Sequence, residues 1–283
     1  MKLSVMLFPF HRLLSEGALE PTAFVRDLRA AGVTAIEPMA SWIRSDPVNW
    51  GRFDAAARSA GMVYSCYDIG VNLIGESVAD RQAALELVAR EVAFCRDELQ
   101  CFVALLPGTR PAAGMSNEEG RRLYGEALAQ AATLSAATGV TLTIEDFGVY
   151  PHFACAARHC MEVLNGAGET LRFTFDNGNF LLASDLPLEA YIATRPRLAH
   201  VHIKDFCPRD PDGSPSLTSV GGVPYQGCLI GDGSAQVREC LQALRRDGYE
   251  QWISIEVGGG NPVEQALHGA RVIRAVWQAG KPQ

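Results

Sequence analysis

The sequence of 283 residues contains no hydrophobic run that approaches the length needed to cross a bilayer, about 18–20 apolar residues. It also lacks a basic excess, since 25 Lys and Arg against 32 Asp and Glu give a net charge of −7. This charge argues against nucleic acid or an anionic membrane as the main partner. The apolar stretch after Lys2 is too short for a signal peptide and stops at Pro9. We therefore expect a cytoplasmic protein that binds neither nucleic acid nor membranes.

Eight cysteines are spread between residues 66 and 240, and no two of them form a C-x-x-C pair. This spacing argues against a zinc ribbon and against a dithiol redox site. The sequence has only six histidines, few for the multi-metal cluster of a barrel endonuclease, which would also need a basic groove. We interpret the cysteines as small buried hydrophobic residues.

One pattern recurs along the chain, a short β-rich segment followed by a loop and a helical segment rich in Ala, Leu and Arg. Strands are expected at 2–8, 33–37, 62–69, 101–106, 140–146, 172–176, 198–204 and 251–257. Helices are expected between them, for example at 21–31, 80–99, 118–138, 235–246 and 262–279. Eight such units predict an α/β fold, a single (β/α)₈ TIM barrel, whose usual size is about 250 residues.

A doubly wound sheet is the competing fold, but it would need a glycine-rich phosphate loop after its first strand. The first expected strand instead runs into Phe8, Pro9 and Phe10, and no glycine occurs before Gly17. No linker marks a second domain, so residues 1–283 are expected to form one barrel domain. The long segment at about 206–230, rich in Pro, Gly and Ser, should lie as a loop on the catalytic face.

Polar and apolar residues alternate towards the ends of four expected strands. In 142–145, for example, the polar Thr143 and Glu145 share one face, and the apolar neighbours share the other. In a barrel the polar face points inward, and the carboxyl ends of the strands meet at the catalytic mouth. The pattern therefore predicts that four ionisable side chains converge there: Glu145, Asp176, His202 and Glu256.

Three carboxylates and one imidazole in one pocket lose solvation and repel one another unless a cation neutralises them. Three oxygen ligands and one nitrogen suit Mn²⁺, Mg²⁺ or Co²⁺ in an open site better than a structural zinc site, with Zn²⁺ as an alternative. The spacing supports consecutive units, because Glu145 and Asp176 are 31 residues apart and Asp176 and His202 are 26 apart. These four residues are the predicted metal ligands.

Five short motifs occur in an order that resembles a known family, the xylose isomerase-like TIM barrels, which include sugar phosphate and ketose isomerases and epimerases. The motifs are Thr143-Ile-Glu145, Phe175-Asp-Asn-Gly-Asn179, His200-Val-His-Ile-Lys-Asp205, Leu229-Ile-Gly-Asp-Gly233 and Gly248 to Glu256. The resemblance covers essentially the whole chain. It implies a Glu–Asp–His–Glu metal site that matches the four residues reached from the strands.

The sequence departs from the ketose 3-epimerases of this family at three positions. Asn179 stands where those enzymes have a histidine near the substrate, Pro208 where they have an arginine, and Pro151 where they have a second glutamate. Substrate recognition is therefore expected to differ from theirs.

The resemblance implies a metal-dependent isomerase or epimerase of a keto sugar or sugar phosphate. The metal would stabilise an enediolate, and Glu145 and Glu256 would act as catalytic acid and base. A dehydratase of a keto-cyclitol or a dehydroshikimate-like substrate would use the same site, and a non-catalytic binding protein is a further alternative. The expected partner is a small carbohydrate substrate. Barrels resembling this one are usually dimers or tetramers, which suggests a homo-oligomer.

Other polar residues near the expected strand ends are candidates for substrate binding: Asn179, Lys204, His11, His152, Asn72 and Glu37. His200 lies one layer deeper than His202 on the same strand face and is expected to hydrogen-bond a ligand carboxylate or to belong to the core. Lys204 could instead join an ion pair. Glu37 could instead contact a metal ligand from behind, or form a salt bridge to a neighbouring strand. Backbone N–H groups at 231–233 are a candidate anion site, with an ordinary loop-to-helix turn as the alternative.

Overall fold

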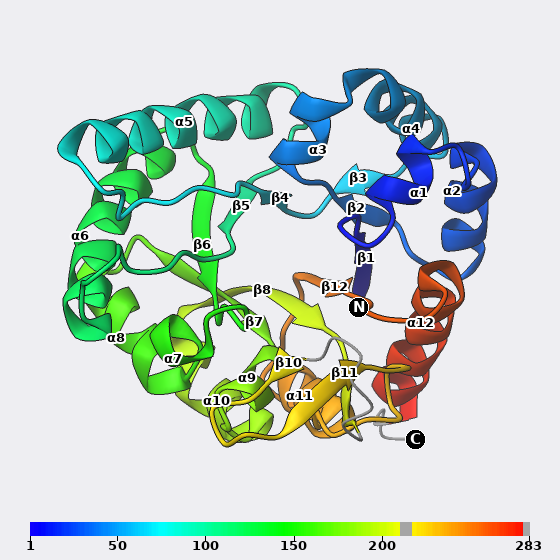
Figure 1. Cartoon of the computed structure of the whole chain (residues 1–283). Helices are drawn as coiled ribbons and strands as arrows, with labels where there is room; N and C mark the ends of the chain where they lie inside the picture. The colour runs from blue at the N-terminus through cyan, green and yellow to red at the C-terminus, as the bar shows by residue number, and fades with distance from the viewer. Residues whose placement is uncertain (210–216, 280–283) are drawn as a thin grey trace.

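The computed structural model describes residues 1–209 and 217–279, and these residues form a barrel of parallel strands inside a ring of helices (Figure 1). The strands pair in the order β3-β2-β1-β12-β8-β7-β6-β5-β4. Their bounds are β1 Lys2–Met6, β2 Ala35–Glu37, β3 Val63–Tyr64, β4 Tyr67–Asp68, β5 Val103–Leu106, β6 Thr141–Glu145, β7 Arg172–Asp176, β8 Leu198–Ile203 and β12 Trp252–Ile255. The predicted α/β barrel is confirmed.

The third expected strand, 62–69, is divided into two short strands, β3 and β4. β3 pairs with β2, whereas β4 pairs with β5, so this one segment joins the two ends of the strand order. A parallel bridge between Met39 and Asp68 links β4 to the loop after β2. The barrel therefore has eight positions, as the sequence indicates, and its third position changes partner between Tyr64 and Tyr67.

The helices cover the outer face of the barrel on all sides (Figure 1). The longer ones are α2 Pro21–Ala30, α4 Pro47–Ser59, α5 Val78–Asp97, α6 Asn117–Ala136, α8 Ala157–Ala167, α10 Pro187–Thr194, α11 Val237–Arg246 and α12 Pro262–Ala279. The short ones are α1 His11–Ser15, α3 Ala40–Ser45, α7 Pro151–Ala154, α9 Asn179–Leu182 and the 3₁₀ turn Arg195–Arg197. None of the helices in the described ranges is long and apolar enough to cross a membrane.

Local sequence signals explain where several helices begin. Helix α5 starts two residues before the predicted position, because Ser77 and Asp80 form a capping box. The Ser77 hydroxyl accepts from the Asp80 N–H, and the Asp80 carboxylate accepts from the Ser77 N–H. Gly139, which follows helix α6, has a φ of +81°, a conformation that glycine adopts without strain.

The alternation read from the sequence is present in the strands. Leu142 and Ile144 of β6, and Phe173 and Phe175 of β7, are buried in the main hydrophobic core. Their polar neighbours face the barrel interior, where the hydroxyls of Thr143 and Thr174 hydrogen-bond at 2.8 Å. This arrangement directs the last polar residue of each strand towards the mouth of the barrel.

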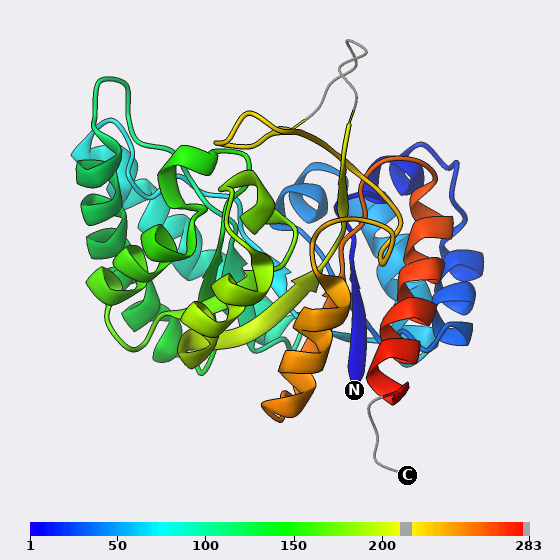
Figure 2. The same ribbon diagram turned by 90° about the horizontal axis from the view of Figure 1, so that it is seen from below.

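The segment at 206–230 is more regular than the loop expected from its composition. Three short strands, β9 Phe206–Pro208, β10 Leu217–Thr218 and β11 Pro224–Gly227, pair in an antiparallel sheet. Figure 2 shows the yellow part of this sheet above the carboxyl ends of the barrel strands. Gly221 and Gly222 lie in the turn between β10 and β11, where Gly222 has a φ of +82°. Residues 210–216 of the segment lie outside the described residues.

Candidate metal centre and cavity

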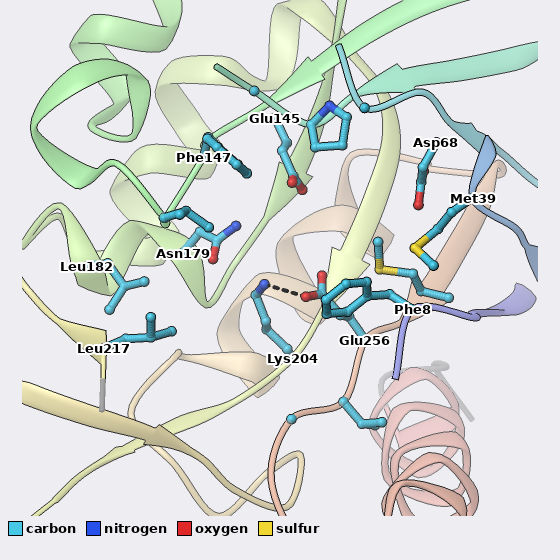
Figure 3. A pocket seen from close by; sticks show the side chains of 18 of the residues that line it. Phe8, Met39, Asp68, Glu145, Phe147, Asn179, Leu182, Lys204, Leu217 and Glu256 are labelled. Atoms are coloured by element: carbon cyan, nitrogen blue, oxygen red, sulfur yellow. Dashed lines mark hydrogen bonds and ion pairs between the residues drawn. The ribbon is translucent and has the colours of Figure 1, made fainter. Parts of the chain in front are cut away.

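A cavity of about 500 Å³ opens at the carboxyl ends of the barrel strands (Figure 3). Its walls are largely apolar and include Phe8, Met39, Phe147, Leu182 and Leu217. The polar side chains that line it are fewer: Ser41, Asp68, Glu145, Asn179, Lys204, Asp205 and Glu256. A cavity of this size and composition suits a small organic molecule held by a few polar contacts.

The four predicted ligands come together at the base of this cavity. One ligand atom from each of Glu145, Asp176, His202 and Glu256 lies within 4.8 Å of the others. His202 Nδ1 is 3.3 Å from Glu145 Oε2, 3.4 Å from Glu256 Oε2 and 3.9 Å from Asp176 Oδ2. Strands β6, β7 and β8 and the end of β12 each supply one of these residues, as the alternation indicates.

The donor set fits a divalent cation. Glu145 Oε2 and His202 Nδ1 are buried and have no hydrogen bond partner among the described residues, although they lie side by side. Buried polar atoms of this kind are costly unless something pairs with them. A cation between them would satisfy both, and three carboxylates with one imidazole are ligands that Mn²⁺, Mg²⁺ and Zn²⁺ accept. These four residues could therefore hold a metal ion.

Burial and neighbouring charges set the pKa values of these ligands apart. Burial raises the pKa of Asp176 to about 7, and it also raises the pKa of Glu145. Burial acts in the same direction on Glu256, but the attraction of Lys204 and His202 outweighs it and holds the pKa of Glu256 well below its usual range. The two glutamates therefore differ in pKa: that of Glu145 lies above its ordinary value and that of Glu256 lies below it.

Lys204 is a partner of two ligand carboxylates. Its Nζ lies 2.8 Å from Asp176 Oδ2. It also lies 2.8 Å from Glu256 Oε1 (Figure 3). Burial alone would lower the pKa of Lys204, but the carboxylates around it hold that pKa above its ordinary value. Lys204 also lines the cavity, so both roles considered for it in the sequence, ion pair and cavity contact, are compatible with its position.

Glu37 lies beneath the ligand cluster and hydrogen-bonds both histidines of β8. Its carboxylate is 2.8 Å from His202 Nε2 and 2.9 Å from His200 Nε2. Burial raises the pKa of Glu37, but the charges of His202 and His200 outweigh it and hold the pKa well below its usual range. Glu37 thus fixes the ring of His202 so that Nδ1 faces the three carboxylates. His200 bonds this carboxylate rather than one of the ligand carboxylates.

The candidate anion site at 231–233 is already filled by the protein. The Asp205 carboxylate accepts hydrogen bonds from the N–H groups of Gly231, Gly233, Ala235 and Phe206. At Gly233 a Cβ atom would collide with Asp205, so a side chain does not fit there. The glycine motif therefore positions an internal carboxylate at the cavity wall and leaves no room for a phosphate group.

Of the six residues predicted to bind substrate, Asn179 and Lys204 line the cavity and four do not. Each of these four has another environment. His11 hydrogen-bonds the Phe8 carbonyl through Nδ1, and His152 is exposed on helix α7. Asn72 accepts from the Thr109 hydroxyl and from two backbone N–H groups, so it shapes its own loop. Glu37 is fully buried beneath the ligands.

Sequence reasoning missed Asp68, which lines the cavity at the end of β4. The signal was present, because Asp68 is the last polar residue of its expected strand, just as Asp176 is of its own. It also missed the apolar walls. Phe147 and Leu217 come from a loop and from the small sheet, where no periodic pattern indicates direction, and Phe8 lies beyond the end of β1 at Met6 although the expected strand included it.

The model of the family described as "Xylose isomerase-like TIM barrel" matches residues 25–276. The chain belongs to this family. Among curated proteins, residues of this chain are 28% identical over 108 positions to inosose dehydratase of Lacticaseibacillus casei. That match covers 36% of this chain and 36% of the relative, so it spans about a third of the relative's length.

Solved structures of low sequence identity share the fold over nearly the whole chain. A probable 3-DHS dehydratase from Bacillus anthracis has a TM-score of 0.74 at 14% identity, covering 97% of this chain and 99% of that chain. D-psicose 3-epimerase from Clostridium cellulolyticum H10, solved with D-tagatose, has a TM-score of 0.70 at 14% identity, covering 99% of each. The IOLI protein, solved with a zinc atom, has a TM-score of 0.73 at 13% identity and covers 100% of each. Epimerases and dehydratases are thus among the proteins that share this fold.

Proposed function

We propose that this protein is a divalent-metal-dependent epimerase or isomerase of an unphosphorylated keto sugar. The observation that carries the proposal is the convergence of Glu145, Asp176, His202 and Glu256 within 4.8 Å at the base of the cavity. Mn²⁺, Mg²⁺, Co²⁺ and Zn²⁺ are the candidate ions. A bound ion would supply Lewis acidity that stabilises negative charge on a substrate oxygen.

Glu145 and Glu256 are suited to move the proton. They reach the cavity from opposite sides (Figure 3), and both line it. The low pKa of Glu256 beside Lys204 favours the ionised base that removes a proton from the carbon next to the carbonyl. Glu145 lines the cavity on the other side, from which it would return a proton on the other face. Asn179 and Lys204 would orient the substrate hydroxyls.

The charge of the cavity supports a substrate without phosphate. Among the described residues, Lys204 is the only Lys or Arg that lines the cavity, and it is already paired with two carboxylates. The carboxylates of Glu145 and Glu256 make the lining acidic. The backbone N–H groups of Gly231, Gly233 and Ala235 are occupied by Asp205. A phosphate dianion would find few free donors and several like charges here.

Dehydration of a keto-cyclitol is the second candidate, and the match to inosose dehydratases favours it. The first proton transfer would be the same, and Glu145 or Lys204 would then protonate a departing β-hydroxyl. The two reactions differ in product, because only dehydration forms a conjugated alkene that absorbs in the ultraviolet.

Proton exchange in D₂O tests the proposed function. The protein is incubated with Mn²⁺ and a panel of free ketoses, ketose phosphates and keto-cyclitols, with and without EDTA, and followed by NMR. Deuterium uptake with an inverted or isomerised product is the expected result, restricted to unphosphorylated members. A new alkene signal would establish the dehydratase instead. Uptake from ketose phosphates alone, or none from the whole panel, would refute the proposal.

Metal binding should release protons and strengthen as pH rises from 6 to 8. Burial raises the pKa of Asp176 to about 7. Burial lowers the pKa of His202, but the charge of Glu37 outweighs it and raises this pKa, so both groups hold protons at pH 6. A ligand must lose its proton to bind a cation, so the affinity falls as pH drops below 7. Calorimetric titration of Mn²⁺ in two buffers of different ionisation enthalpy measures the protons released. Equal affinity at pH 6 and pH 8 would contradict this expectation.

Replacing Glu37 should weaken metal binding without removing a ligand. In Glu37→Gln one acceptor oxygen becomes an NH₂ group, so only one of the two histidine bonds can persist. We expect the dissociation constant for Mn²⁺ to rise about 10-fold to 100-fold. Thr174→Val is the control, since it removes another buried hydrogen bond of the barrel interior, to Thr143. The positioning role would be wrong if both variants bound Mn²⁺ like the wild type.

A further inference from the structure

A fifth carboxyl group at the cavity, that of Asp68, has no role in the function proposed above. Asp68 ends strand β4, where its N–H donates to the Pro38 carbonyl at 3.0 Å and its backbone bridges to Met39. The residue is only 3% exposed, yet it lines the cavity. On the other side of β4, Asp68 pairs with Leu105 of β5, so its backbone is held from both sides.

Both oxygens of the Asp68 carboxyl are buried and have no hydrogen bond partner in the described parts of the chain. Leaving a buried polar group without a partner costs free energy, so such a group usually has a ligand or a water as its partner. Asp68 stands outside the group of four ligand residues, so it does not complete the metal site. Figure 3 shows its carboxyl directed into the cavity, across from Asn179.

The surroundings of Asp68 favour a hydroxyl group as that partner. Met39 is the labelled side chain beside it on this side of the cavity, and it offers no polar atom of comparable strength (Figure 3). The buried Glu37 lies close to Asp68, and two such carboxyl groups repel each other unless one of them holds a proton. Burial, followed by the charge of Glu37, raises the pKa of Asp68 well above its ordinary range. A carboxyl that retains its proton both donates and accepts, which matches a hydroxyl group and does not match a phosphate.

We propose that Asp68 is a substrate-binding residue that hydrogen-bonds a hydroxyl of an uncharged polyhydroxy ketone, at the end of the substrate opposite Asn179. The apolar side chains beside Asp68 would then contact the C–H groups at that end of the substrate. This inference rests on the proposed function, because it assumes that the cavity holds a keto sugar or keto-cyclitol.

The test compares Asp68→Ala and Asp68→Asn with the wild type, on whichever ketose or keto-cyclitol of the D₂O panel undergoes exchange. We expect Asp68→Ala to raise KM about 10-fold to 100-fold, with kcat and Mn²⁺ affinity within about threefold. Asp68→Asn should recover most of this loss, because an amide also donates and accepts. A deoxy analogue that lacks the bound hydroxyl should have a raised KM with the wild type. Its KM should be no higher with Asp68→Ala than with the wild type.

Glu91→Gln is the control for loss of a buried carboxylate. Glu91 is similarly buried, at 4% exposed, but it pairs with Arg44 and Tyr67 and does not line the cavity. The KM of the Glu91→Gln variant should therefore equal that of the wild type. A KM within twofold of the wild type in Asp68→Ala would overturn the proposal, as would a fall in Mn²⁺ affinity that accounts for the loss. Absence of exchange in the wild type would instead refute the proposed function, and the role of Asp68 with it.

Discussion

The Glu256→Gln variant should lose substrate proton exchange by about 1,000-fold or more, because the amide cannot accept the proton that Glu256 removes. Its amide oxygen remains available to a cation, so Mn²⁺ binding should weaken without disappearing. The loss of negative charge also removes one of the two ion pairs of Lys204. Deuterium uptake in D₂O, measured beside the Mn²⁺ dissociation constant at saturating metal, separates lost chemistry from lost metal.

Two further variants complete this test. Glu264→Gln is the matched control, an exposed glutamate at the start of helix α12 whose substitution should leave exchange unchanged. Glu145→Gln should retain exchange of the substrate proton but form no inverted product, since Glu145 is the group proposed to protonate the second face. Full exchange in Glu256→Gln would show that Glu256 does not remove the proton. Inverted product from Glu145→Gln would show that Glu145 does not return it.

Removal of the metal should both stop the reaction and lower the thermal stability. At a metal concentration 100 times the dissociation constant, binding stabilises the folded state by about 2.7 kcal/mol. For a domain of this size we expect the Tm to fall by roughly 5–10 °C on chelation with EDTA. The physical reason is that Glu145, Asp176 and Glu256 then repel one another with only Lys204 and His202 to offset them.

Added Mn²⁺ should restore both activity and Tm in the wild type. In Asp176→Asn the added metal should raise the Tm much less, because this variant lacks one of the four candidate ligands. A wild-type Tm that is the same with EDTA and with excess Mn²⁺, measured by scanning calorimetry, would contradict the presence of the metal site.

The barrel and the four convergent side chains were predictable because both depend on periodicity. Alternation along β6, β7 and β8 places Glu145, Asp176 and His202 on one face, and the parallel topology then brings the strand ends together. The third barrel strand was less predictable. Its change of partner between Tyr64 and Tyr67 depends on pairing with β2 on one side and β5 on the other, which are distant in the sequence.

The contacts made by polar loop residues were not predictable, because periodicity gives no direction outside strands and helices. Asn72 and His11 follow strands as expected, yet their side chains bond their own loops. Glu37 lies at a strand end, but it hydrogen-bonds two histidines of β8 and does not line the cavity. Its role depends on the side-chain positions of His200 and His202, which the sequence alone does not fix.

Anomalous diffraction from crystals soaked in Mn²⁺ tests the central claim most directly, namely that Glu145, Asp176, His202 and Glu256 hold a metal ion at the base of the cavity. The predicted result is one strong Mn²⁺ peak within coordination distance of His202 Nδ1 and of an oxygen from each of the three carboxylates. A cavity without such a peak at saturating Mn²⁺, or a peak bound by other residues, would contradict the account.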